Sequence, residues 1–150
     1  MMNIAFSFEA DVEVGPIQEV GRTPKGVRRM VPILGGQFAG PSIEGIILPG
    51  GADWQLIRHD GVAEIEASYA MRTTDGTMIH IVNRGYRHGP KEVMARLAAG
   101  EEVSPEEYYF RTTPTFEVEE GRYSWLSRTL FIGTGERTSD AVRIRFYAVQ

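Results

Sequence analysis

The sequence contains no cysteine among its 150 residues. This absence excludes a disulfide framework and any thiol-based metal or redox site, and it is typical of a cytoplasmic protein. The histidines are equally few and lack the short spacings of a metal-binding motif; they are His59, His80 and His88. We therefore expect neither a metal nor a cofactor.

Long apolar runs and an excess of positive charge are also missing. No stretch approaches the roughly 20 apolar residues of a membrane-spanning helix, and the N-terminal residues 1–14 do not have the basic and apolar segments of a secretory signal. The net charge is −4, with acids and bases interspersed, whereas a nucleic-acid-binding domain is usually basic. The sequence thus predicts a cytoplasmic protein that binds neither membranes nor nucleic acid.

The sequence does contain a strong period of two. Residues 4–14 alternate between apolar and polar side chains, which is typical of a strand with one buried face. Further strand signals cover residues 26–34, 43–48, 55–58, 62–73, 77–86, 108–118, 123–133 and 142–149. One helical excursion, at about residues 90–107, interrupts the strands, because Pro90 and Gly100 suit the start and end of a helix. The chain is therefore mainly β.

The length of 150 residues predicts a single domain over residues 1–150. About eight or nine antiparallel strands in one small domain must protect their edges, and closure into a barrel does so completely. An eight-stranded barrel is just wide enough to hold a small ligand. We expect a single antiparallel β-barrel, with a two-sheet β-sandwich as the alternative and a homodimer as the default assembly.

Six short stretches occur in a characteristic order: GGQFAGP, LPGGADW, RTTDG, YYFRTTPTFE, YSWL and RFYAV. In this order they resemble the bacterial and fungal family called "domain of unknown function 3237", from about Phe6 to the C-terminus. The resemblance implies a small antiparallel β-barrel whose motif residues gather around a pocket. It implies no particular reaction, because the family has no established general activity.

The stretch LPGGADW places Asp53 and Trp54 shortly after two glycines, with Ala52 between them. One interpretation is structural, with a turn aspartate that accepts backbone N–H groups beside a tryptophan in the core. The other is functional, because glycine lets the backbone approach a substrate closely. Trp54 would then form a flat wall for a planar ligand, and Asp53 would be a base or hydrogen-bond acceptor.

The stretch YYFRTTPTFE places Tyr109 and Arg111 on one face of a strand, and we expect that face to line the barrel interior. A buried guanidinium needs a carboxylate partner or an anionic ligand. Candidate partners are Glu117, Glu66 and Asp53, and Arg72 adds a second cation. The alternatives are a structural Arg–Glu pair between strands and, for the strand that carries Glu66, a face that is simply solvated.

Together these residues favour a cofactor-independent lyase or isomerase that acts on a small planar acidic molecule, aromatic or of the enone type, in a barrel-interior pocket. Asp53 or Glu66 would move the proton, Tyr109 would donate a hydrogen bond, and Arg111 would hold the anion. The expected substrate-binding residues are Trp54, Arg72, Glu117 and Trp125. A non-catalytic, lipocalin-like small-molecule carrier is the alternative, and a protein-interaction module is the third possibility.

Overall fold

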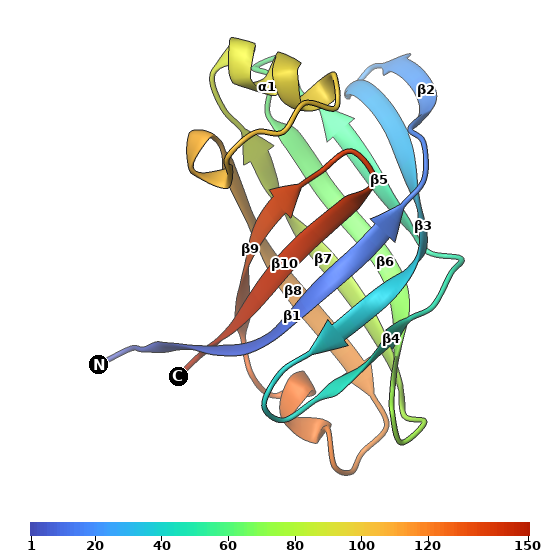
Figure 1. Cartoon of the computed structure of the whole chain (residues 1–150), viewed down its shortest axis with the longest axis vertical. Helices are drawn as coiled ribbons and strands as arrows, with labels where there is room; N and C mark the ends of the chain where they lie inside the picture. Colours follow the sequence, from blue (N-terminus) through green and yellow to red (C-terminus); the bar gives the residue numbers. More distant parts are fainter.

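The computed structural model describes residues 1–150 and consists mainly of β-strands (Figure 1). The ten strands are β1 (Ile4–Val14), β2 (Gln18–Thr23), β3 (Gly26–Ala39), β4 (Glu44–Ile47), β5 (Ala52–Ile57), β6 (Ala63–Thr73), β7 (Met78–His88), β8 (Tyr109–Val118), β9 (Phe131–Arg137) and β10 (Ala141–Val149). The helical segments are α1 (Lys91–Ala98), η1 (Pro105–Glu107) and η2 (Ser124–Ser127).

The sheet closes on itself as an antiparallel barrel. Strands follow one another in the order β1, β10, β9, β8, β7 and β6; β4 and β5 then share one position between β6 and β3, and β3 pairs with β1. This gives a ring of eight positions, with β2 attached outside the ring as a hairpin on β3. The expected barrel is confirmed, and the sandwich alternative is wrong, because the β1–β3 pairing leaves no gap between two sheets.

Two segments differ from the expected elements. Strand β2 had not been expected, because Gln18–Thr23 has no buried face. The expected strand over residues 123–133 starts only at Phe131, since Ser124–Ser127 forms the 3₁₀ segment η2. In η2 the buried Leu126 packs on the barrel core, so a short helical turn buries the apolar residues that had suggested a strand.

The end of the barrel next to η2 is filled. A cluster of phenylalanine rings packs edge-on or tilted there at centroid distances of 4.9–5.9 Å; its members are Phe8, Phe38, Phe116, Phe131 and Phe146. The opposite end carries α1 and β2 (Figure 1). Any ligand in the interior must therefore enter from the α1 end.

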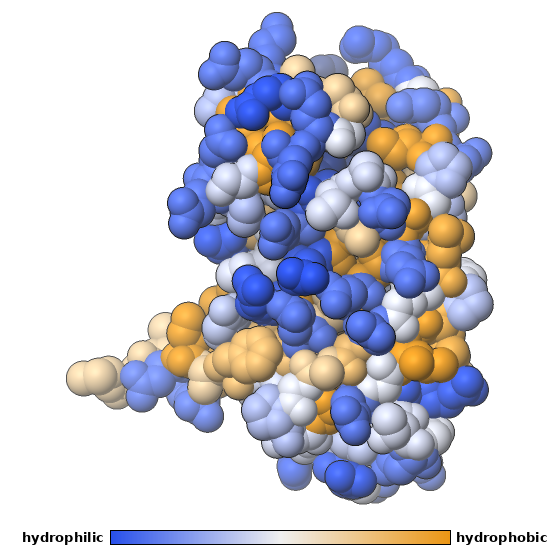
Figure 2. Space-filling model, viewed as in Figure 1, coloured by the Kyte–Doolittle hydropathy of each residue, from blue (hydrophilic) through white to orange (hydrophobic).

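In the view of Figure 2 the middle of the barrel wall is mainly hydrophilic, whereas apolar side chains gather near the chain termini, where the N-terminal arm stands away from the wall. On this wall Arg143 pairs with Asp11 at 2.8 Å and Arg145 pairs with Glu9 at 2.9 Å, across the junction of β1 and β10. No helix of the chain has the length and apolar character needed to cross a membrane.

Candidate functional site

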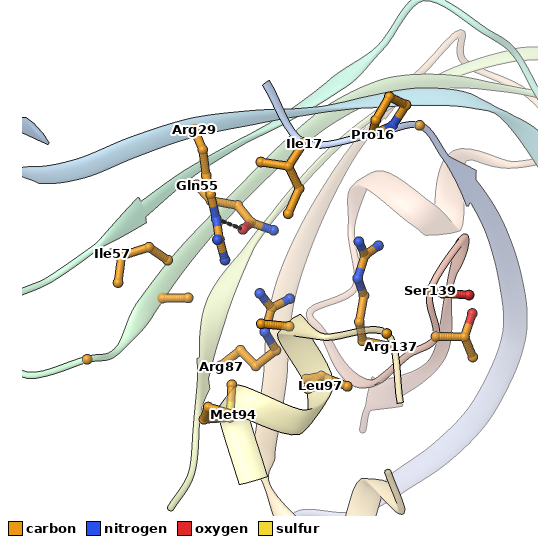
Figure 3. A pocket seen from close by; sticks show the side chains of 16 residues that line it. Pro16, Ile17, Arg29, Gln55, Ile57, Arg87, Met94, Leu97, Arg137 and Ser139 are labelled. Carbon is orange, nitrogen blue, oxygen red and sulfur yellow. Dashed lines mark hydrogen bonds between the residues drawn. The ribbon is translucent and has the colours of Figure 1, made fainter. Parts of the chain in front are cut away.

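The α1 end of the barrel opens into a pocket of about 360 Å³, which we call the mouth pocket. Arg29 of β3, Arg87 of β7 and Arg137 of β9 extend into it from three strands (Figure 3). Met94 and Leu97 of α1 add an apolar surface on one side. The mouth pocket therefore combines three cationic groups with an apolar wall.

A smaller chamber of about 40 Å³ lies inside the barrel. Its walls are mostly aliphatic, and its polar lining includes Asp53, Tyr69 and Asn83. Gln55, Arg87 and Arg137 line both the chamber and the mouth pocket. We call this shared section the neck, because a molecule entering the chamber from the α1 end passes these side chains.

Local sequence explains how Asp53 reaches the interior. Gly50 has φ of +108°, which turns the chain into β5. At Gly51 a Cβ atom would lie 2.4 Å from Cβ of Tyr69, so only glycine permits this approach to β6. Alternation along β5 then directs Asp53 and Gln55 inward and Trp54 outward.

Three hydrogen bonds fix the carboxylate of Asp53 and its neighbour. The Nε2 group of Gln55 donates to Oδ2 of Asp53 at 2.7 Å, and the backbone N–H of Glu66 donates to Oδ1 at 3.0 Å. The Nε group of Arg29 in turn donates to Oε1 of Gln55 at 3.0 Å. The amide of Gln55 thus links a guanidinium in the mouth pocket to the carboxylate of the chamber.

The surroundings of Asp53 oppose its ionisation. Burial raises the pKa of this carboxyl above its ordinary value of 3.8, although the hydrogen bonds from Gln55 and Glu66 and the charges of Arg87 and Arg137 act in the other direction. A carboxyl group whose pKa is raised can accept and return a proton nearer to neutral pH than an exposed aspartate can. Asp53 is therefore suited to proton transfer.

Several buried polar groups next to this carboxylate lack a partner within the protein. They are the hydroxyl of Tyr69, the Oδ1 atom of Asn83 and the Nε group of Arg87, with exposures of 4%, 1% and 6% for the three residues. Buried polar groups are nearly always hydrogen-bonded to protein or water, so three such groups around one cavity offer hydrogen bonds to water or to a polar ligand. Burial also raises the pKa of Tyr69, which leaves its hydroxyl protonated as a donor.

The arginines of the mouth pocket lack acidic partners. None of Arg29, Arg87 and Arg137 forms an ion pair within 4.0 Å. Burial, with the nearby charge of Arg137, lowers the pKa of Arg87 to about 10, so this group still carries its charge at neutral pH. The site is therefore positively charged and suited to an anion.

The structure places only one of the eight predicted site residues in this cavity, namely Asp53. Trp54 is 46% exposed and lines a groove on the outer wall with Arg28, Arg84 and Tyr86. The expectation that Trp54 walls the interior is wrong, because alternation along β5 allows either Trp54 or Asp53 to face inward.

Arg111 and Tyr109 also face outward. On β8 the inward positions belong to Phe110 and Thr112. The guanidinium of Arg111 lies outside, over the ring of Tyr109 at 5.7 Å, and donates to the carbonyl of Phe110 at 3.0 Å. The choice of interior face was wrong for this strand, because burial of Phe110 leaves the charged side in water.

The remaining four residues do not meet around a common space. Glu66 is exposed and pairs with Arg84 at 2.7 Å on the outer wall, as the solvated alternative predicted. Arg72 and Glu117 are exposed as well. Trp125 packs at the filled end of the barrel, 6.2 Å from the ring of Phe131. None of the four lines the mouth pocket or the chamber.

The three arginines of the mouth pocket were not among the predicted site residues, although the sequence contains one signal for them. Each continues the buried face of its strand by steps of two: Arg29 is in phase with Val31, and Arg87 with Asn83 and Ile81. A polar residue at the end of an otherwise apolar face is that signal, and Arg137 repeats it after Gly135.

Comparison with known proteins agrees with the fold. The family model described as "Protein of unknown function (DUF3237)" matches residues 2–149. A UPF0311 protein of Rhodopseudomonas palustris is 42% identical over 144 residues, which cover 96% of this chain and 94% of the relative.

Two solved structures extend this comparison. A conserved protein of unknown function from Rhodopseudomonas palustris has a TM-score of 0.95 at 40% identity, covering 100% of this chain and 98% of the other. An enzyme from Penicillium herquei has a TM-score of 0.74 at 19% identity, covering 99% and 95%, and this distant likeness shows the fold alone. The chain therefore belongs to the family of proteins of unknown function DUF3237, whose relatives include the UPF0311 proteins.

Proposed function

We propose that this protein is a cofactor-independent lyase or isomerase that acts on a small acidic molecule at the α1 end of the barrel. The observation that carries the proposal is the carboxyl of Asp53, which has a raised pKa and lies in the same chamber as the unpartnered groups of Tyr69 and Asn83. Titratable groups shifted by burial and gathered in a cavity are typical of catalytic sites.

Each group has a proposed role. Asp53 abstracts or returns a proton, and the hydroxyl of Tyr69 stabilises the oxygen on which negative charge develops. Arg87 and Arg137 hold the acidic group of the substrate. A positioned proton shuttle contributes about 10²–10⁴-fold, and a positioned donor to a developing oxyanion about 10²–10³-fold, which suffices for eliminations, retro-aldol cleavages and isomerisations of activated acids.

Of the two cavities, the mouth pocket is the one with room for a planar ring, so a substrate that carries a ring would place it there. An apolar cavity of about 150 Å³ is known to accept benzene, and the mouth pocket has about 360 Å³ against about 40 Å³ in the chamber. The side chains of Met94 and Leu97 offer an apolar surface to a ring there. The walls of this proposed ring site thus come from α1 and replace the tryptophans of the sequence-based hypothesis.

The two alternatives receive different support. A carrier of apolar ligands has no use for three unpaired arginines and a buried acid, so the charges of the mouth pocket disfavour it. A protein-interaction module would use an exposed aromatic surface, and Trp54 and Tyr86 are 46% and 50% exposed on the outer wall. This outer groove is the observation that favours the interaction module as the second candidate.

The test is a screen for turnover with the substitution Asp53→Asn. Small oxo acids, hydroxy acids and enone acids are incubated with the protein, and their conversion is followed by proton NMR. We expect wild type to convert at least one of them and Asp53→Asn to be about 10²–10⁴-fold slower. The matched control is Glu66→Gln, because Glu66 is the nearby acid on the outer wall and lies away from the chamber.

Two results would contradict the proposal. Equal turnover by wild type and Asp53→Asn would show that this carboxyl does not transfer the proton. Tight binding of an acid from the screen without conversion of any of them would identify a carrier instead.

A further inference from the structure

The site has three sections in succession, the mouth pocket, the neck and the chamber. Only Gln55, Arg87 and Arg137 line both the mouth pocket and the chamber. A substrate that reaches Asp53 from the mouth pocket therefore has one part in the chamber, one part at the neck and any remaining part in the mouth pocket. The lining of each part limits the chemistry that fits there.

At the neck the fitting group is an anion. Two guanidiniums converge there without an acidic partner within 4.0 Å (Figure 3), and the Nε group of Arg87 is buried and unpartnered. Asp53 is the one carboxylate that lines the chamber, and it already accepts from Gln55 and from the backbone of Glu66. The planar fork of arginine matches a carboxylate.

In the chamber the fitting group is very small. A water molecule needs roughly 10–15 Å³ of such a cavity, so about 40 Å³ holds roughly three non-hydrogen atoms. A cavity known to accept benzene has about 150 Å³, several times the volume of the chamber, so a ring does not fit there. The group beyond the carboxylate is therefore no larger than a carbonyl with one methyl or methylene.

The polar groups of the chamber favour a carbonyl. The hydroxyl of Tyr69 is buried, protonated and without a partner, so it can donate to a carbonyl oxygen. Asp53 lines the same space and can take a proton from the carbon next to that carbonyl. A carbonyl makes the neighbouring C–H acidic because the resulting charge moves to its oxygen, where a positioned donor stabilises it.

We propose that the substrate is a short oxo carboxylate, with its carboxylate on Arg87 and Arg137 at the neck and its carbonyl end in the chamber. This inference rests on the proposed function and adds the class of substrate. The carboxylate of Asp53 removes a proton from the carbon beside the carbonyl, the C–H electron pair forms the enolate, and Tyr69 hydrogen-bonds the enolate oxygen. The carboxyl proton of Asp53 then exchanges with solvent, and transfer of the solvent-derived proton (a deuteron in D₂O) from Asp53 to that carbon completes the exchange.

The test uses pyruvate and its uncharged amide, pyruvamide, as probes. Binding to wild type is measured by calorimetry, and exchange of the methyl protons of pyruvate for deuterium is followed by proton NMR in D₂O. The variants are Arg87→Met at the neck and Asp53→Asn in the chamber. Arg28→Met is the matched control, because Arg28 lies on β3 beside Arg29 but faces the outer groove.

We expect wild type to bind pyruvate at least about tenfold more tightly than pyruvamide, the factor that corresponds to one charge-assisted hydrogen bond. Arg87→Met should bind pyruvate at least about tenfold more weakly than wild type, and Arg28→Met should bind it with unchanged affinity. Asp53→Asn should bind pyruvate without exchanging its methyl protons. The pyruvamide comparison needs no substitution, so it decides the point even where Arg87→Met does not fold.

Failure of the inference and failure of the proposed function give different results. Equal binding of pyruvate and pyruvamide, or no binding of pyruvate, overturns the inference that the substrate is an oxo carboxylate. Selective pyruvate binding by wild type without any deuterium exchange leaves the anion site in place and overturns the proton transfer. Deuterium exchange that persists in Asp53→Asn overturns the role of this carboxyl both in the proposed function and in the further inference.

Discussion

At the scale of single residues, the proposed site consists of the carboxyl of Asp53 and three arginines that form no ion pair within 4.0 Å. Arg87 is buried, whereas Asp53, Arg29 and Arg137 are partly exposed. Asp53 could be predicted as a candidate from its position after two glycines, and the structure places it in the chamber. Arg111 was predicted as a site residue because it shares one face of a strand with Tyr109, and that face was expected to line the barrel interior. The choice of face failed there, since only the packing of Phe110 decides which side of β8 is inward.

The raised pKa of Asp53 predicts a pH-dependent difference between wild type and Asp53→Asn. Because burial makes the folded protein hold this proton more tightly than the unfolded chain, the contribution of the carboxyl is fully present below the ordinary pKa of 3.8 and is lost as the pH rises through the folded pKa. Wild type should therefore lose stability relative to the variant over this window. Urea unfolding of both proteins across the acid range measures the difference, and Glu66→Gln serves as the control.

The opposite trend would contradict the burial of this carboxyl. If wild type gained stability over Asp53→Asn as the pH rises, the carboxylate would be stabilised in the folded protein by its arginine neighbours. The electrostatic assignment of the site would then be reversed.

At the scale of elements, β5 illustrates what sequence patterns can and cannot predict. The turn at residues 48–51 and the strand after it were recognisable from glycine chemistry and apolar alternation. The face of β5 was not, because Asp53 and Trp54 are both reasonable interior residues and only the pairing with β3 and β6 selects one. Strand β2 and segment η2 were missed for a related reason, since neither has a buried face that repeats every second residue.

The approach of β5 to β6 predicts a large effect of Gly51→Ala. The added Cβ would lie 2.4 Å from Cβ of Tyr69 and 2.6 Å from the carbonyl oxygen of Ser68, and neither atom can move without shifting β6. We expect a loss of about 1–3 kcal/mol in the free energy of unfolding, measured in urea, together with weaker proton transfer, because Asp53 follows on the same strand. Pro49→Ala in the same exposed turn should change stability by less than about 0.5 kcal/mol.

A stable and fully active Gly51→Ala protein would contradict this role of the turn. It would mean that the position of Asp53 does not depend on the close contact between the two strands.

At the scale of the whole molecule, the barrel has a filled end and an open end. The barrel itself could be predicted, because many alternating strands in a small chain must close or hide their edges. The division of its interior could not, since it depends on which inward residues are large. A cluster of phenylalanines fills the η2 end, whereas mainly valine, isoleucine and polar side chains surround the chamber.

This division predicts that stability resides mainly in the aromatic end. Phe8 is fully buried there, whereas Phe6, two residues earlier on β1, is 46% exposed. Phe8→Ala should lower the free energy of unfolding by about 3–5 kcal/mol, and Phe6→Ala should lower it by much less. Urea unfolding compares the two, and equal losses would contradict the filled end as the main core.

The central claim is that a buried acid and an anion share the α1 end of the barrel, and the titration of Asp53 tests it most directly. The carboxyl carbon of Asp53 can be followed by carbon NMR in isotope-labelled protein, with Asp53→Asn to assign the signal. We predict a pKa above the ordinary 3.8 and a further rise when pyruvate is added, because a bound anion offsets the charges of Arg87 and Arg137. A pKa at or below 3.8 that does not respond to pyruvate would contradict the account.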